Sequence, residues 1–410
     1  MTQWIHPTRV FFWIALLTGL ASLALAPLAS AVSTKSKKPK PAGFMFTQSN
    51  VPSGNSLYVF ERDKKGKLKQ TQTVKTGGKG TTQDVGCGAG CTILDSQGAV
   101  DSVGKLVFVV NGGSDTVTSF KETGNGFKRV DTAPSGGDLP NSLVARGGLL
   151  YVLNTTSGNI YGLRYTSSGK LTPISGSSKP IAGQGQNDIF PSGGARQIGY
   201  DNTGGWVVVS ELATVVGGPP PGVISAFKLN SDGTTGSGVP TKSQTPLPFG
   251  FAFNNNNTLV VSEVNDPTGA TDGSTSSYSF NTATGAPTAV PPPLTSGGAL
   301  PCWVSLTSDG THAFVINTGG GRPAGAAKYD VGAGGALTSK GVTTAPAGTF
   351  AWTDPAQSSD SKYLYVLAPG VMPNAQGRID SYKISGSGGL TFLGSTKKNL
   401  PTSVSGLDGR

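Results

Sequence analysis

Residues 301–319 read PCWVSLTSDGTHAFVINTG and contain the unit that decides the fold. An apolar stretch leads into an SDG turn, and a second apolar stretch follows and ends at the polar Asn317. Short apolar runs between turn residues predict β-strands. The same arrangement recurs along the chain, with second strands that begin at Gly43, Lys105, Leu149, Trp206, Thr258, His312 and Lys362.

Each second strand is followed by a third strand with an aromatic residue and then by a Gly-containing hairpin such as KGKL, SGKL, GGAL or SGGL. The hairpin leads to a weaker fourth strand. Seven copies of roughly 50 residues predict an all-β fold, a seven-bladed β-propeller with four-stranded antiparallel blades. Two packed β-sandwiches are the alternative, but they would not require a recurring four-strand unit.

The first copy has no opening strand of its own, whereas the last copy is followed by the strand-like segment LPTSVSGLDG. We therefore expect Thr402–Leu407 to complete the first blade, so that the C-terminal strand closes the ring and protects the open sheet edges.

Composition supports this fold and excludes others. The 410 residues include 61 Gly and 28 Pro, and only 13% are charged, which disfavours a helical bundle. The formal net charge is +10. There is no basic helix, zinc-finger spacing or aromatic RNA-binding motif, so nucleic acid is not an expected partner.

The N-terminus has the charged start, apolar centre and small-residue end of a secretory signal, with Arg9, a long apolar run and the sequence Ala29-Ser30-Ala31. We predict a signal peptide over 1–31, a basic flexible linker over 32–42 and the propeller over 43–410. The protein would be exported to the periplasm or the extracellular space, with no membrane span after cleavage. An uncleaved membrane anchor is the alternative.

Three cysteines have different expected roles. An exported protein can oxidise Cys87 and Cys91 across the flexible CGAGC loop, so we predict a disulfide between them. Cys302 lies in an apolar run and is expected to be a buried free thiol. Zinc is not expected, because the third cysteine is distant and the exported chain would keep only one histidine, His312.

Three phrases carry a family resemblance: SGGARQIGYDNTGGWVVVSEL at 192–212, PFGFAFNNNNTLVVSEV at 248–264 and the opening stretch at 301–319. They resemble the exported bacterial branch of the seven-bladed propeller lactonase superfamily, which is related to 6-phosphogluconolactonase and carboxymuconate lactonizing enzyme. The resemblance implies an arginine, a glutamate and a histidine near the central channel. Arg196 and Glu211 match the first two as catalytic residues, whereas Gln197 stands at the histidine position.

Propeller geometry predicts a second set of site residues. Polar side chains at the ends of strands beside the channel converge from different blades. The matching positions, which we expect to bind a ligand with Gln197, are Asn111, Asn154, Glu263 and Asn317, with Glu211 at the same level. Hydrogen bonding between blades is the alternative role. No cofactor is expected; two glutamates with amides would suit a divalent cation, but Arg196 would oppose it.

Two functions remain open from the sequence. The first is a lactone hydrolase or a muconate-cyclase-like isomerase that acts on a small acidic lactone through Arg196 and Glu211. The second is a non-catalytic propeller, expected to be a monomer, that binds a small molecule, glycan or protein on one face.

Overall fold

The computed structural model describes residues 40–81, 94–182, 194–212, 222–265, 268–370, 376–396 and 400–410. Residues 41–410 form one compact unit. The predicted signal peptide and the predicted disulfide of Cys87 and Cys91 lie outside the described residues, as does all but the end of the predicted linker.

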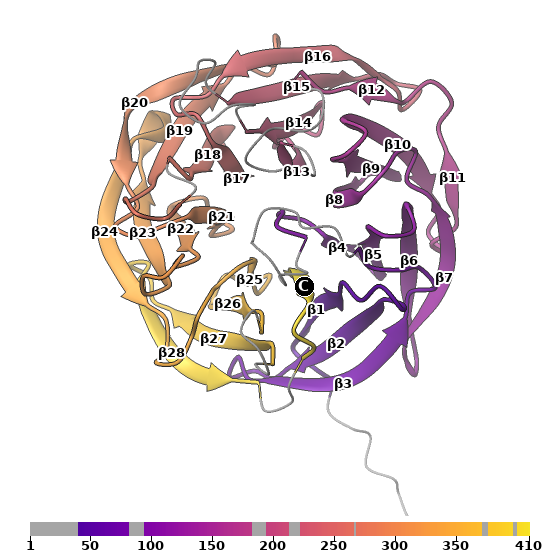
Figure 1. Cartoon of the computed structure of the whole chain (residues 1–410), viewed down its shortest axis with the longest axis horizontal. Helices are drawn as coiled ribbons and strands as arrows, with labels where there is room; N and C mark the ends of the chain where they lie inside the picture. Colours follow the sequence, from indigo (N-terminus) through magenta and orange to yellow (C-terminus); the bar gives the residue numbers. More distant parts are fainter. Residues whose placement is uncertain are drawn as a thin grey trace, which may run out of the picture. The chain divides into compact units, whose positions relative to one another are not determined.

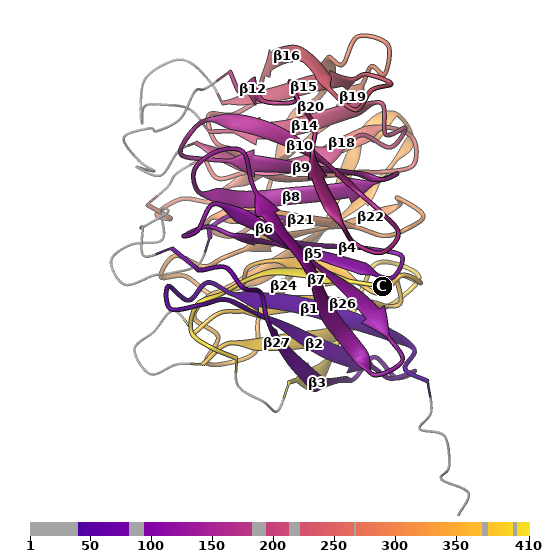
Figure 2. The same ribbon diagram turned by 90° about the vertical axis from the view of Figure 1, so that its right-hand side faces the viewer.

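Seven antiparallel sheets surround a central axis (Figure 1; the side view is in Figure 2), which confirms the predicted seven-bladed β-propeller. We number the blades in chain order, and each is given from its innermost to its outermost strand. Blade 1 contains β29 (Val404–Gly409), β1 (Gly43–Ser49), β2 (Ser56–Arg62) and β3 (Leu68–Lys75). Blade 2 contains β4 (Val100–Val103), β5 (Leu106–Asn111), β6 (Thr116–Thr123) and β7 (Gly126–Pro134).

Blades 3 to 5 follow the same order. Blade 3 contains β8 (Pro140–Arg146), β9 (Leu149–Asn154), β10 (Asn159–Tyr165) and β11 (Leu171–Pro173), and β12 (Lys179–Pro180) also pairs with β10. Blade 4 contains β13 (Ala195–Tyr200), β14 (Trp206–Glu211), β15 (Val223–Leu229) and β16 (Thr235–Lys242). Blade 5 contains β17 (Pro248–Phe253), β18 (Thr258–Glu263), β19 (Ser274–Phe280) and β20 (Pro287–Thr295).

Blades 6 and 7 complete the ring. Blade 6 contains β21 (Pro301–Leu306), β22 (His312–Asn317), β23 (Gly325–Val331) and β24 (Leu337–Thr344), with the short 3₁₀ helix η1 (Ala333–Gly335) before β24. Blade 7 contains β25 (Pro355–Gln357), β26 (Tyr363–Ala368), β27 (Arg378–Ile384) and β28 (Leu390–Ser395). All seven predicted second strands are therefore confirmed.

The C-terminal strand closes the ring as predicted. Strand β29 pairs antiparallel with β1, from Met45 opposite Gly409 to Ser49 opposite Val404. The observed strand begins and ends two residues later than the predicted Thr402–Leu407. Blade 1 thus combines β29 with β1, β2 and β3. It cannot be completed without residues from both ends of the propeller sequence.

The core lies between neighbouring blades. The second strands are buried on both faces, and β5, β14, β18 and β26 are buried at every position. One apolar cluster, for example, packs Phe46 of blade 1 against Val107 and Phe120 of blade 2. The outermost strands are more exposed, and β3 alternates between partly buried and exposed positions, because only one of its faces meets a neighbour.

Candidate functional site

The innermost strands enclose a cavity of about 380 Å³ on the propeller axis. All seven innermost strands contribute to its wall: β29, β4, β8, β13, β17, β21 and β25. This volume lies within the range of pockets that bind small molecules. The cavity therefore is the preformed concave site that the ring geometry creates.

Residues 94–98, which we call the plug, cross the centre of the ring before β4 begins (Figure 1). Gln97 bonds with both backbone groups of Val304 on β21, through its Nε2 (2.8 Å) and its Oε1 (2.9 Å). At the other end of the plug, the amide of Leu94 donates to the hydroxyl of Ser405 on β29. Gln97 and Gly98 line the cavity, so the plug forms one wall of it.

Two aspartates from neighbouring blades lie on the cavity wall. Asp101 belongs to β4, and its Oδ2 accepts a hydrogen bond from the amide of Ala145 at 2.6 Å. Asp408 belongs to β29, and its Oδ2 accepts from the hydroxyl of Ser102 at 2.5 Å. Their pKa values are both raised, chiefly because the carboxyls are removed from bulk water; the charge of Asp408 raises the pKa of Asp101 further. The pair therefore retains a proton at a pH where ordinary aspartates are ionised.

The ends of the blades explain why most predicted site residues are absent from this cavity. In an antiparallel blade, the end of the second strand lies beside the start of the innermost strand. Glu211 thus pairs with Ala195, and Glu263 pairs with Pro248. We call this side of the ring the upper face. The cavity wall instead contains later residues of the innermost strands, such as Gly199 and Phe253.

Arg196 lies at the upper face and is completely buried. Its Nη1 lies 4.0 Å from Oδ2 of Asp95 in the plug, and its guanidinium sits 5.7 Å from the ring centre of Phe249. Burial lowers the pKa of Arg196, an effect that the charge of Asp95 opposes. Arg196 follows Ala195, the partner of Glu211, so the structure brings the two predicted catalytic residues to the same end of blade 4. Neither of them lines the cavity.

Gln197 is the one predicted site residue on the cavity wall. Its Nε2 donates to the carbonyl of Phe251 at 2.9 Å, and its Oε1 accepts from the amide of the same residue at 2.6 Å. The side chain that replaces the family histidine therefore joins β13 to the exposed edge of β17.

The other predicted ligand-binding residues make hydrogen bonds between blades. Each is the last residue of a second strand and contacts the first residue after the outermost strand of the preceding blade. Asn111 accepts from the hydroxyl of Thr76 at 2.8 Å, and the amide of Asn154 donates to the carbonyl of Ser135 at 3.0 Å. Asn317 binds the carbonyl of Ser296 in the same way, at 3.0 Å.

Glu263 repeats this pattern with a carboxylate. Its Oε1 accepts hydrogen bonds from the hydroxyls of Ser243 (2.7 Å) and Tyr278 (3.3 Å), and its Oε2 accepts one from Thr245 at 2.5 Å. Burial raises the pKa of Glu263 to about 7, although these hydrogen bonds lower it. Glu211 departs from the pattern, because the equivalent residue after β12 is the apolar Ile181. The alternative structural role thus fits Glu263 and the three asparagines better than it fits Glu211.

Sequence reasoning missed Asp101 and Asp408, which lie far apart in the sequence but in neighbouring blades. A signal for them existed. Asp408 follows the segment predicted to close the ring, and Asp101 lies in an equivalent first strand before the turn at Gly104. Treating the first strands as the channel wall would have identified both.

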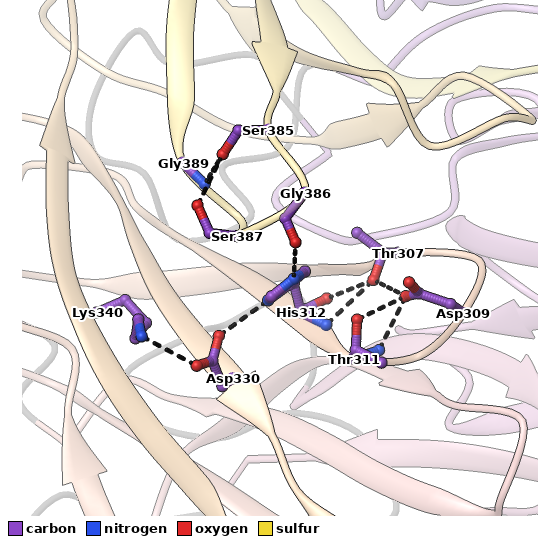
Figure 3. Close-up of polar contacts among 10 residues, drawn as sticks. All are labelled: Thr307, Asp309, Thr311, His312, Asp330, Lys340, Ser385, Gly386, Ser387 and Gly389. Atoms are coloured by element: carbon purple, nitrogen blue, oxygen red, sulfur yellow. Dashed lines mark hydrogen bonds and ion pairs between the residues drawn. The ribbon is translucent and has the colours of Figure 1, made fainter.

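Two further predicted residues lie away from the cavity or behind its wall. Cys302 is a buried free thiol, as expected, and burial raises its pKa well above the ordinary value. His312 begins β22, where Nδ1 lies 2.9 Å from Asp330 and Nε2 lies 3.3 Å from the carbonyl of Gly386 (Figure 3). Its side chain is only 15% exposed.

No group of three or more His, Cys, Asp or Glu side chains suited to a metal occurs within the described ranges. In the same part of the chain, no helix is long and apolar enough to cross a membrane.

Comparisons with known proteins agree with this architecture. Residues 53–183 match the family model "Lactonase, 7-bladed beta-propeller". These residues therefore resemble that family, and the whole chain is a seven-bladed β-propeller. A solved structure from Bacteroides fragilis, named as a 6-phosphogluconolactonase, matches 91% of this chain and 99% of its own, with 17% identity and a TM-score of 0.66. The periplasmic gluconolactonase of Pseudomonas aeruginosa matches 90% and 99%, with 15% identity and a TM-score of 0.62.

At these identities the solved structures support the fold of this chain alone. No curated protein matches its sequence. The activity must therefore be argued from the residues of this chain.

Proposed function

We propose that this protein is an exported hydrolase that opens a small lactone in the axial cavity. The carboxyl pair of Asp101 and Asp408 carries the proposal, because it places two interacting acids on the wall of a cavity of suitable size. Two carboxyls with separated titrations supply a general acid and a general base at the same pH. The lactonase-like fold supports this class of reaction, although fold alone does not assign chemistry.

One carboxyl acts as the general base and the other as the general acid. The ionised member takes a proton from water as the water oxygen attacks the lactone carbonyl carbon. The protonated member gives its proton to the ring oxygen as the bond between that oxygen and the carbonyl carbon breaks. The product is the open hydroxy acid. The hydrogen bonds from Ala145 and Ser102 hold the two carboxyls in place during this exchange.

The test is lactone hydrolysis by the purified protein and by the variants Asp101→Asn and Asp408→Asn. Loss of a general acid or base removes about two to four orders of magnitude in kcat. We expect such a loss in each variant, with little change in KM and in the melting temperature. Full activity in both well-folded variants would exclude this pair.

The same assay tests the upper-face hypothesis from the sequence. Glu211→Gln and Arg196→Ala should retain activity if the reaction occurs in the cavity, provided that both variants melt like the parent. A loss of activity confined to Glu211→Gln would indicate that the reaction occurs at the upper face. Binding of a lactone without turnover, in the parent protein, would favour the non-catalytic alternative.

Export rests on the predicted signal peptide at 1–31. The periplasmic location in the name of the Pseudomonas aeruginosa neighbour supports it as an analogy. N-terminal sequencing of protein recovered outside the cytoplasm should begin at Val32. Recovery of a chain that still begins at Met1 would contradict the predicted cleavage.

A further inference from the structure

The axial cavity is acidic in a basic protein. Two aspartates lie on its wall, and among the described residues that line it there is no lysine, arginine or histidine. The whole chain nevertheless carries a formal net charge of +10. Among the described residues, the cationic side chains are thus absent from the cavity wall to which all seven blades contribute.

The arginines nearest to this wall along the chain are directed elsewhere. Arg196 precedes the wall residue Gln197, but its guanidinium lies beside Asp95 and Phe249. Arg146 ends β8 and donates to the carbonyls of Asp201 and Asn202 in the turn between β13 and β14.

Arg410 follows β29, two residues after Asp408. It forms an ion pair with Glu122 at 3.0 Å, and its guanidinium lies over the rings of Phe44, Phe46 and Phe127 at 5.3 to 5.7 Å. An anionic ligand in the cavity would have to break such contacts to recruit any of these three arginines.

We propose that the cavity selects uncharged lactones and rejects phosphorylated or carboxylated ones. The inference rests on the proposed hydrolase function and replaces the small acidic substrate that the family resemblance implied. A phosphate group in the cavity would face carboxylate charge without a cationic partner, in surroundings that screen charge less than water does. The rest of the wall is suited to an uncharged ring, because it presents apolar side chains such as Leu143, Phe251 and Val304.

The probes are glucono-1,5-lactone and its 6-phosphate, which share one ring and differ by the phosphate. Hydrolysis of each by the purified protein is followed in a pH-stat. We expect kcat/KM to favour the uncharged lactone by at least about 100-fold, from Coulomb repulsion at short range. Equal or better hydrolysis of the phosphorylated lactone would overturn the inference and leave the proposed hydrolase function intact.

A charge variant makes the test specific to this cavity. Ala252 lies on the wall and is partly buried. Ala252→Lys should lower the ratio of kcat/KM for the uncharged lactone to that for the phosphorylated lactone by about tenfold or more. The matched uncharged variant Ala252→Met should keep this ratio. An unchanged preference in a folded Ala252→Lys protein would show that selection arises outside the cavity.

Failure of the hydrolase proposal gives a different result. If neither lactone is hydrolysed, the two compounds are compared by calorimetric titration. Tighter binding of the uncharged compound by the parent protein, together with a smaller difference in affinity between the two compounds in Ala252→Lys, would still support charge selection. Tighter binding of the phosphorylated compound, or no binding of either, would overturn it.

Discussion

At the residue scale, one position in the repeat has a structural use that recurs in four blades. The last residue of a second strand bonds to the residue that follows the preceding outermost strand, as Asn111, Asn154, Glu263 and Asn317 do. Burying a polar group is unfavourable unless it is hydrogen-bonded, so each of these pairs depends on both partners. The innermost strands carry the cavity chemistry instead, at Asp101 and Asp408.

Glu263 allows this structural role to be measured. Glu263→Gln keeps hydrogen-bonding capacity without charge and should change the free energy of unfolding by less than about 1 kcal/mol. Glu263→Ala leaves the partner hydroxyls unsatisfied and creates a void, at a cost of about 2–4 kcal/mol. Urea denaturation measures both. Unchanged stability of Glu263→Ala together with lost lactone turnover would instead assign Glu263 to the site.

At the scale of elements, side-chain hydrogen bonds join neighbouring blades. Nδ1 of His312 on β22 forms a hydrogen bond with Asp330 on β23. Its Nε2 contacts the carbonyl of Gly386 in the turn between β27 and β28 (Figure 3). Lys340 on β24 pairs with the second oxygen of Asp330 at 3.1 Å. The histidine thus joins blade 6 to blade 7, whereas the lysine contact stays within blade 6.

This difference predicts unequal effects of two substitutions. His312→Ala removes the contact between blades and should lower the free energy of unfolding by about 1–2 kcal/mol. Lys340→Ala removes an exposed ion pair and should cost less than about 1 kcal/mol. Urea denaturation of both variants measures which loss of unfolding free energy is larger. A larger loss for Lys340→Ala would mean that the histidine contact contributes little to the junction.

The closing strand gives a stronger prediction. Deleting 401–410 removes β29 and exposes the edge of β1. The truncated protein should melt at least several degrees lower or fail to fold. Asp408→Asn is the control, since it alters the cavity and keeps the strand. Melting curves that coincide for the truncated and full-length proteins would refute closure by β29.

At the scale of the whole molecule, buried acids link stability to pH. Burial raises the pKa of Glu263 to about 7 and that of Asp354 to about 7, and it also raises the pKa values of Asp101 and Asp408. The native state therefore binds more protons than the unfolded state between about pH 4, where ordinary carboxyls titrate, and about pH 8, because the pKa of Asp101 is raised to about 8. Its stability is highest at the acidic end of this window.

Stability should consequently fall as pH rises from about 5 to about 8, with a decrease of a few degrees in melting temperature. Below pH 4 the trend should reverse, because hydrogen bonds lower the pKa values of Asp131 and Asp330 despite some desolvation. Melting curves across this range provide the measurement. The double variant Glu263→Gln/Asp354→Asn should flatten the slope, and an equally steep slope in it would contradict the assignment.

The sequence by itself determined the repeat, the seven buried second strands and the closure of the ring. These are local properties: apolar runs, Gly-bearing turns and an orphan strand, each readable within one unit such as residues 301–319. It also identified Cys302 as a buried thiol, because an apolar run predicts burial without knowledge of its neighbours.

Only the tertiary structure decided which polar residues share a site. Glu263 and Asn317 looked like channel residues because they end strands, but strand pairing places them behind the innermost strands, where each meets the preceding blade. Asp101 and Asp408 became neighbours because the last strand of the chain joins the first blade. The plug likewise crosses the axis through bonds to blades distant in sequence. Such proximity depends on contacts between residues far apart in the sequence, which no local pattern encodes.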